Sequence, residues 1–295
     1  MKALNFLLGE DFIKARSQWL YPTEPMQDLL RSILIAVPIF LFFTVLQSVF
    51  AGIVDVLVYH ADGDSLKSLA AGAKAATTAS DPHMANLIKS MIIGMFPAAV
   101  ITIFLTVAAS HLGLPKNLGT LPLQWPKIRP LGWFLILVSF LLAVSLISSG
   151  LFSALGINPD DYGVGPGGLN DPNSKAGLVE KALASLATEP GLFILALPGA
   201  VLGAPLVEEI LFRGVLFAGL VTRLGRFWTV VLTAAVWAAA HLGAAPAVFA
   251  LMIFFMGLVL GTLMLRFGSL WVPIACHTVW NLVVTLGLYH AGSGQ

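Results

Sequence analysis

The hydrophobic run at residues 192–222, LFILALPGAVLGAPLVEEILFRGVLFAGLVT, decides how the rest of the chain is interpreted. It is long enough to cross a membrane as a helix, yet it contains Glu208, Glu209 and Arg213 close together. Charged side chains at membrane depth are costly unless they have partners inside the protein, and they usually mark function. We therefore expect a polar site in this segment.

The composition is typical of a membrane protein. Of the 295 residues, 58% are hydrophobic and 11% are charged, whereas about a quarter of the residues in a soluble domain are charged. We predict an all-α fold, a polytopic transmembrane helical bundle of seven or eight spans. The net charge of +1 gives no reason to expect a nucleic acid partner. The single Cys276 cannot form an intramolecular disulfide, and we expect it to be a small buried residue.

Hydropathy places the spans and leaves three segments to interpret. Residues 3–20 are expected to form an amphipathic helix at the membrane interface. The block 191–222 is too long for one straight span and is expected to break near Pro198 and Pro205, giving one full crossing and a shorter outer piece. Loop 156–189 is rich in Gly, Pro, Asn and Asp and is expected to be irregular, either a lid or a linker. The expected spans are residues 32–54, 90–111, 131–155, 191–222, 227–243, 247–265 and 270–289.

The loops between the spans alternate in charge. Loop 112–130 carries Lys116, Lys127 and Arg129 and no acidic residue, whereas loop 55–89 carries four aspartates. Short loops rich in Lys and Arg stay in the cytoplasm. We therefore predict a cytoplasmic N-terminus and a C-terminus on the other side of the membrane.

Helical geometry separates the two glutamates. Glu209 and Arg213 are four residues apart and share a face of the helix, whereas Glu208 points about 100° away. We expect Glu209 to pair with Arg213, which leaves Glu208 free for chemistry. Pro205, one turn earlier, can bend the helix and let water reach the carboxylate. The alternative is a buried ion-pair cluster that only holds the helices together.

Two histidines in later helical stretches are candidate partners for Glu208. His241 is expected at a similar depth on the adjacent antiparallel helix, so its imidazole can meet the carboxylate. His277 and Asn281 are four residues apart on the last span. Both could donate hydrogen bonds to a developing negative charge, or both could make only interhelical hydrogen bonds. Trp237, one turn from His241, is expected to pack.

Other membrane chemistries lack their usual patterns. The chain has no His-Glu-x-x-His zinc helix and no Gly-x-Ser-x-Gly elbow. Glu208, His241 and His277 could together bind zinc, but their spacing selects neither metal nor water. The pattern Gly257-x-x-x-Gly261 predicts close helix packing.

Three ordered motifs resemble those of the CAAX protease and bacteriocin-processing family, also called CPBP or Abi. They are Glu208-Glu209-x-x-x-Arg213, Trp237-x-x-x-His241 and His277-x-x-x-Asn281. The similarity covers residues 190–290 as the catalytic core, and residues 1–189 supply the N-terminal spans and loops of the same integrated membrane domain. The family pattern more often has Phe where this chain has Trp237. The resemblance implies an eight-helix membrane bundle.

The resemblance also implies roles for the motif residues. Glu208 would be the general base, and His241 would help to hold and polarise the attacking water. His277 and Asn281 would form the oxyanion hole. The ion pair expected between the second glutamate and the arginine would orient and support the site. The implied mechanism uses no metal and no other cofactor.

We therefore predict an intramembrane glutamic endopeptidase, similar to type II CAAX prenyl proteases. Its partners would be the lipid bilayer and a membrane-associated or lipidated peptide or protein substrate, such as a CAAX-type tail or a leader peptide. We expect a multi-pass protein of a bacterial inner membrane. The alternatives are a non-proteolytic membrane scaffold or immunity protein and a zinc-dependent membrane hydrolase that uses the same residues. A transporter is less favoured, because no lined pathway is evident.

Overall fold

Every element in the described part of the chain is a helix. The computed structural model describes residues 25–59, 82–111, 121–162, 177–242 and 247–293. The amphipathic helix expected at residues 3–20 lies outside these ranges. The predicted all-α fold is confirmed.

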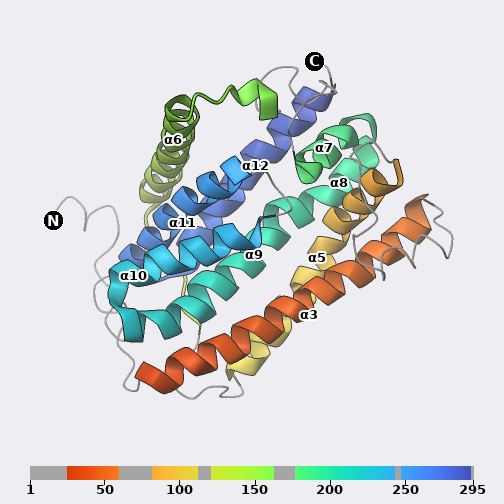
Figure 1. Cartoon of the computed structure of the whole chain (residues 1–295). Helices are drawn as coiled ribbons and strands as arrows, with labels where there is room; N and C mark the ends of the chain where they lie inside the picture. Colours follow the sequence, from red (N-terminus) through yellow and green to blue (C-terminus); the bar gives the residue numbers. More distant parts are fainter. Residues whose placement is uncertain (1–24, 60–81, 112–120, 163–176, 243–246, 294–295) are drawn as a thin grey trace.

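Figure 1 shows the arrangement of the helices. In chain order they are α3 (Pro25–Tyr59), α5 (Pro82–His111), α6 (Pro130–Ala154), α7 (Leu178–Ser185), α8 (Pro190–Pro198), α9 (Ala204–Glu208), α10 (Phe217–Ala240), α11 (Ala247–Phe267) and α12 (Trp271–Ser293). The π-helical segments η4 (Gly199–Gly203) and η5 (Glu209–Leu216) connect α8, α9 and α10. The 3-10 segments are η2 (Pro159–Tyr162) and η3 (Leu186–Thr188).

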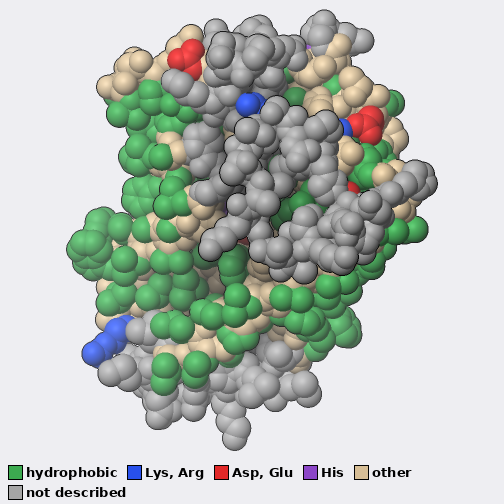
Figure 2. Space-filling model, turned by 45° about the vertical axis from the view of Figure 1, so that its right-hand side comes forward, with side chains coloured by type: hydrophobic (Ala, Val, Ile, Leu, Met, Phe, Trp, Pro, Cys, Tyr) green, Lys and Arg blue, Asp and Glu red, His purple; other side chains and the backbone are tan. Residues whose placement is uncertain are grey.

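Six helical segments of the described chain are long and apolar enough to cross a membrane. They are Ser32–Tyr59, Ala85–Ala108, Pro130–Ala154, Pro190–Val221, Ala247–Phe267 and Trp271–Ser293. Many of their large apolar side chains face outward, and Leu57, Phe104 and Leu146 are each 71% exposed. Figure 2 shows hydrophobic side chains over the middle of one face and charged ones toward its two ends. Because such a surface favours lipid over water, this is an integral multi-pass membrane protein.

The span expected at residues 227–243 is the second part of α10. Gly225 separates this part from the first, with φ 72° and ψ 176°. Glycine adopts a positive φ without steric strain. The part that follows ends at Ala240, so it is shorter than the roughly 20 residues of a full crossing. The chain turns at Gly225, and the end of α10 returns to the level of α9, where Trp237 bonds to Glu208.

The block Pro190–Val221 is one continuous helical run, so the predicted break near Pro198 and Pro205 is wrong. The boundary residues between α8, η4, α9 and η5 all have right-handed helical backbone angles. A proline ring clashes with the carbonyl of the preceding α-helical turn. The wider π turn relieves this clash without ending the helix. The expected outer piece is therefore part of the same run.

The loop expected to be irregular at residues 156–189 is partly helical. Its last part forms α7 and η3, which pack against α5 and α12. Leu183 and Leu186 are buried there in one cluster with Phe193 of α8. An amphipathic turn of helix can bury such side chains, which the Gly- and Pro-rich composition upstream did not suggest. Residues 163–176 lie outside the described chain.

Close backbone contacts hold the bundle together. α3 packs along α5 at one edge of the bundle, and α11 packs along α10 (Figure 1). A Cβ on Gly257 would lie 2.8 Å from the Cβ of Ala234, and one on Gly261 would lie 3.1 Å from Val230. The close helix packing predicted for these two glycines is confirmed. Cys276 is fully buried in the core, as expected.

Gly199 allows η4 to pack directly on α5. A Cβ at this position would lie 2.2 Å from the backbone oxygen of Ile92, so Gly199→Ala should force the two helices apart. We expect this change to destabilise the purified protein by about 1–3 kcal/mol in an unfolding titration in detergent. Gly191→Ala is the matched control, since its Cβ meets nothing within 4 Å. Equal stability of the two variants would contradict the close approach.

Glu180 in α7 makes stability depend on pH. Its Oε2 is buried without a hydrogen-bond partner in the described part of the chain, and burial raises the pKa of this carboxyl above its ordinary value. The folded state therefore holds the proton more tightly than the unfolded state. Stability is lost as the pH rises through the folded pKa and is intact below the unfolded value of about 4.3. Glu180→Gln should raise the unfolding temperature at pH 7 and leave it unchanged near pH 4.

Candidate active site

Glu209 and Arg213 form a buried ion pair within η5. Arg213 Nη1 donates to Glu209 Oε1 at 3.0 Å, and both side chains are fully buried. The predicted pairing is therefore present. His277 of α12 also reaches this oxygen, with Nδ1 3.0 Å away. One carboxylate oxygen thus joins the middle of the block Pro190–Val221 to the last helix.

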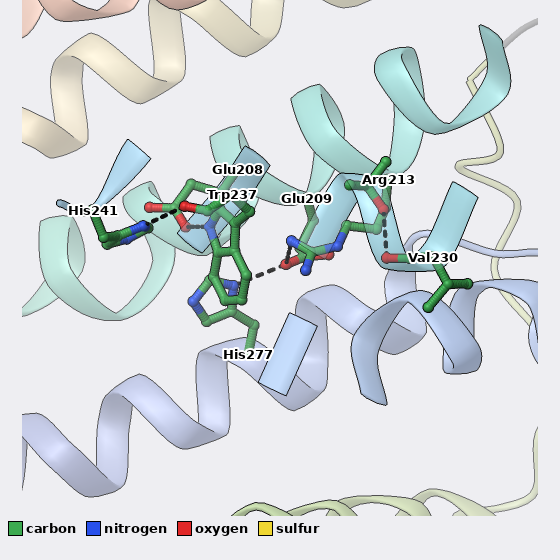
Figure 3. Close-up of polar contacts among 8 residues, drawn as sticks. Glu208, Glu209, Arg213, Val230, Trp237, His241 and His277 are labelled. Atoms are coloured by element: carbon green, nitrogen blue, oxygen red, sulfur yellow. Dashed lines mark hydrogen bonds and ion pairs between the residues drawn. The ribbon is translucent and has the colours of Figure 1, made fainter. Parts of the chain in front are cut away.

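The carboxylate of Glu208 is separate from this ion pair. Glu208 is the last residue of α9, is only partly buried, and its Oε2 accepts a hydrogen bond of 2.6 Å from Trp237 Nε1. Figure 3 shows the two glutamates directed to different sides, Glu208 toward Trp237 and His241 and Glu209 toward Arg213. The division expected from helical spacing, with Glu208 outside the ion pair, is present in the structure.

Trp237 lies at the centre of the cluster and packs in the core, as expected, but it also donates a hydrogen bond that its position in the sequence did not predict. Its side chain is 1% exposed. The guanidinium carbon of Arg213 lies 4.3 Å from the indole ring centroid. The rings of His241 and His277 meet the indole edge to face, at centroid distances of 5.5 and 5.2 Å. A buried indole N–H needs a hydrogen-bond acceptor. The presence of a tryptophan in this apolar stretch of the sequence could therefore have indicated a nearby acceptor.

The aromatic contact completes the surroundings of the buried cation. The Nε and Nη2 atoms of Arg213 are buried and have no hydrogen-bond partner among the described residues. A guanidinium over the face of a tryptophan is attracted by the ring's quadrupole, more strongly where water is excluded. Trp237 therefore stabilises the part of the Arg213 charge that Glu209 does not contact.

The backbone of the same tryptophan sets the tautomer of His241. His241 caps the C-terminus of α10, and its Nδ1 lies 2.8 Å from the carbonyl oxygen of Trp237. A carbonyl oxygen can only accept, so Nδ1 carries the hydrogen. In the neutral ring Nε2 then has a free lone pair, which can accept a proton or hold a water.

His277 is oriented in a similar way by a carboxylate. Its side chain is almost fully buried, and Nδ1 donates to Glu209 Oε1, the oxygen that Arg213 also contacts. A neutral His277 therefore presents a lone pair at Nε2. It can donate a hydrogen bond from Nε2 only when both ring nitrogens are protonated. This condition applies to any oxyanion role of His277.

Asn281 makes an interhelical hydrogen bond. Its Nδ2 donates to the backbone oxygen of Ala200 in η4, at 2.9 Å. The amide thus joins α12 to the π-helical turn. An interhelical hydrogen bond was one of the two roles that the spacing of His277 and Asn281 allowed. An amide nitrogen carries two hydrogens, so one donor of Asn281 is left for another acceptor.

The two imidazoles have the outer hydrogen bonds that metal-binding histidines often have. In the described residues, however, no three His, Cys, Asp or Glu side chains are grouped closely enough to hold a metal ion. Glu208, His241 and His277 are brought to one region without forming such a group.

Residues 190–283 match the model of one protein family, described as type II CAAX prenyl endopeptidase Rce1-like. This segment is similar to that family. The Rce1-like segment contains all the motif residues discussed above, and the match confirms the resemblance seen in their order. It points to a CAAX-type membrane protease. No curated protein and no solved structure matches the chain.

Loss of the arginine in the Rce1-like segment should be strongly destabilising. Arg213→Met would leave the Glu209 charge buried beside His277 alone, and removing one partner of a buried pair costs about 3–5 kcal/mol. We expect a loss of this size in chemical unfolding of the detergent-solubilised protein. Arg223→Met is the control, because Arg223 is exposed. Adding Glu209→Gln to the Arg213 variant should recover part of the loss; wild-type stability of Arg213→Met would refute the pairing argument.

Proposed function

We propose that the protein is an intramembrane endopeptidase in which Glu208 activates a water molecule to cleave a peptide bond. The observation that carries this proposal is the separation of the two glutamates. Glu209 is fully buried and neutralised by Arg213, whereas Glu208 is partly exposed and bonds to a neutral indole. Glu209 Oε2 has no hydrogen-bond partner among the described residues but is buried, so Glu208 is the glutamate of the two that is exposed enough to bind a water. The Rce1-like match supports the reaction class.

The chemistry begins with a water held between Glu208 and His241. Glu208 accepts a proton from the water as general base, and the resulting hydroxide attacks the carbonyl carbon of the scissile peptide bond. The Nε2 lone pair of His241 orients the water by accepting its other hydrogen. The C–N bond then breaks, and the proton on Glu208 passes to the leaving amine. The products are a new carboxyl terminus and a new amine.

Stabilisation of the tetrahedral intermediate is assigned to His277 and Asn281. His277 donates from Nε2 when both ring nitrogens carry a hydrogen, while Glu209 accepts from Nδ1 and holds the ring in place. Asn281 donates the amide hydrogen that Ala200 does not use. Donors fixed in a site shielded from water stabilise a developing oxyanion more strongly than donors in water.

The proposed substrate is a membrane-associated or lipidated peptide segment, either a CAAX-type tail or a leader peptide. Such a segment reaches a buried site along the bilayer rather than from bulk water. We assign the protein a cytoplasmic N-terminus on the charge alternation of its loops. Its Ala- and Leu-rich, Trp-containing spans and its single cysteine favour a bacterial inner membrane. Residues 190–290 form the catalytic core, and residues 1–189 complete the same membrane domain.

A zinc-dependent hydrolase that uses the same residues is the second candidate. This candidate is supported by the tautomers of His241 and His277. In each neutral ring the hydrogen is on Nδ1, so the lone pair of Nε2 could bind a cation. Metal analysis of the purified protein distinguishes the two candidates. Stoichiometric zinc together with loss of cleavage in chelator would favour this candidate over the metal-free mechanism.

The proposal is tested by comparing protein termini in membranes from cells with the wild-type protein and with Glu208→Gln. We expect at least one membrane-protein terminus that appears only with the wild type, because loss of a general base lowers the rate about 10²–10⁴-fold. Glu180→Gln is the control for a carboxyl change elsewhere. If Glu208→Gln is folded and every terminus is unchanged, the protein is a scaffold or immunity protein instead of a protease.

A further inference from the structure

We propose that the indole N–H of Trp237 is the positioning group that holds one oxygen of Glu208 and directs the other to the attacking water. The inference rests on the proposed function and adds a residue to it. Trp237 touches neither substrate nor water in this scheme, so it acts only through Glu208 and His241.

The hydrogen bond is specific because neither partner has an equivalent alternative in the described structure. The indole has one donor, and it lies in a side chain that is 1% exposed. That donor is directed at Glu208 Oε2 at 2.6 Å. A carboxylate held at one oxygen loses rotational freedom about its terminal bond. Its other oxygen then has a defined direction.

The tryptophan is itself held on several sides. The Arg213 guanidinium lies over its face, and the ring of His277 lies against it. On the α11 side, a Cβ on Gly257 would lie 3.2 Å from the indole Cε3. The glycine thus leaves room for the large ring. These contacts make the indole a rigid support for Glu208.

One residue therefore places both groups that would hold the water. Its side chain binds Glu208, and its backbone carbonyl binds His241 Nδ1. Both interactions start from the same residue of α10 (Figure 3). A phenylalanine at this position would keep the backbone contact and the aromatic face and would lose only the N–H.

The kinetic test is Trp237→Phe, assayed on the membrane protein whose terminus depends on Glu208. We expect the cleavage rate at saturating substrate to fall about tenfold or more, with KM changed less than about twofold, because the base is misplaced while substrate contacts are kept. Trp271→Phe is the matched control. It also loses an indole hydrogen bond, that of Nε1 to the Leu123 oxygen at 2.7 Å, and it should cleave at the wild-type rate. A Trp237→Phe rate within twofold of the wild type would overturn the proposal.

A spectroscopic test does not need cleavage. In protein labelled with ¹⁵N at its indole nitrogens, the Trp237 N–H resonance is identified by its loss in Trp237→Phe. Glu208→Gln should shift this resonance, since a neutral amide replaces a charged acceptor, and should leave the Trp271 resonance in place. No shift would overturn the positioning role whatever the activity. A shift with no Glu208-dependent cleavage would instead refute the proposed function, and with it the catalytic purpose of the bond.

Discussion

The buried charge of Glu209 is the constraint on which the rest of the structure around it depends. A carboxylate with no exposed surface inside a membrane protein must be neutralised and hydrogen-bonded by the protein itself. Arg213, one turn along the same segment, and His277, from the last helix, meet at a single oxygen. This meeting fixes η5 against α12. It also leaves Glu208, the preceding residue in the chain, directed toward α10.

Helical continuity and close packing make this meeting possible. The π-helical segments keep the block Pro190–Val221 helical past its prolines, so both glutamates stay on a defined surface. The wider turn also offers the Ala200 carbonyl to Asn281. Gly199 and Gly257 remove the Cβ atoms that would push α5 and α11 away. The π-helical turns and the glycines thus allow Glu208, Glu209 and Asn281 to lie close together in an apolar bundle.

Local patterns predicted what depends on one helix at a time. Hydropathy identified the six helical segments that are long enough to cross a membrane, but it also predicted a crossing at residues 227–243, where the helix is too short. The spacing of Glu209 and Arg213 predicted their contact, because residues four apart share a helix face. The predicted break at Pro205 was wrong because a proline has two outcomes, a kink or a widened turn, and packing selects between them. The role of Trp237 was missed for a related reason. From the sequence, a tryptophan near a histidine is expected to be a core residue. Only the structure shows that the N–H of Trp237 donates to a carboxylate.

By itself, the sequence determined the fold class, the approximate spans and the set of motif residues, since these follow from apolar composition and from periodicity along the chain. Only the tertiary structure decided which acceptor each donor reaches. His277 bonds to Glu209, Asn281 to Ala200, and Trp237 to Glu208. These pairings join residues of different helices, and their geometry depends on how far each helix advances and turns against the next. The spacing of residues along the chain carries no information about how one helix is placed against another. The hydrogen-bond partners of the catalytic candidates could therefore be named only from the folded bundle.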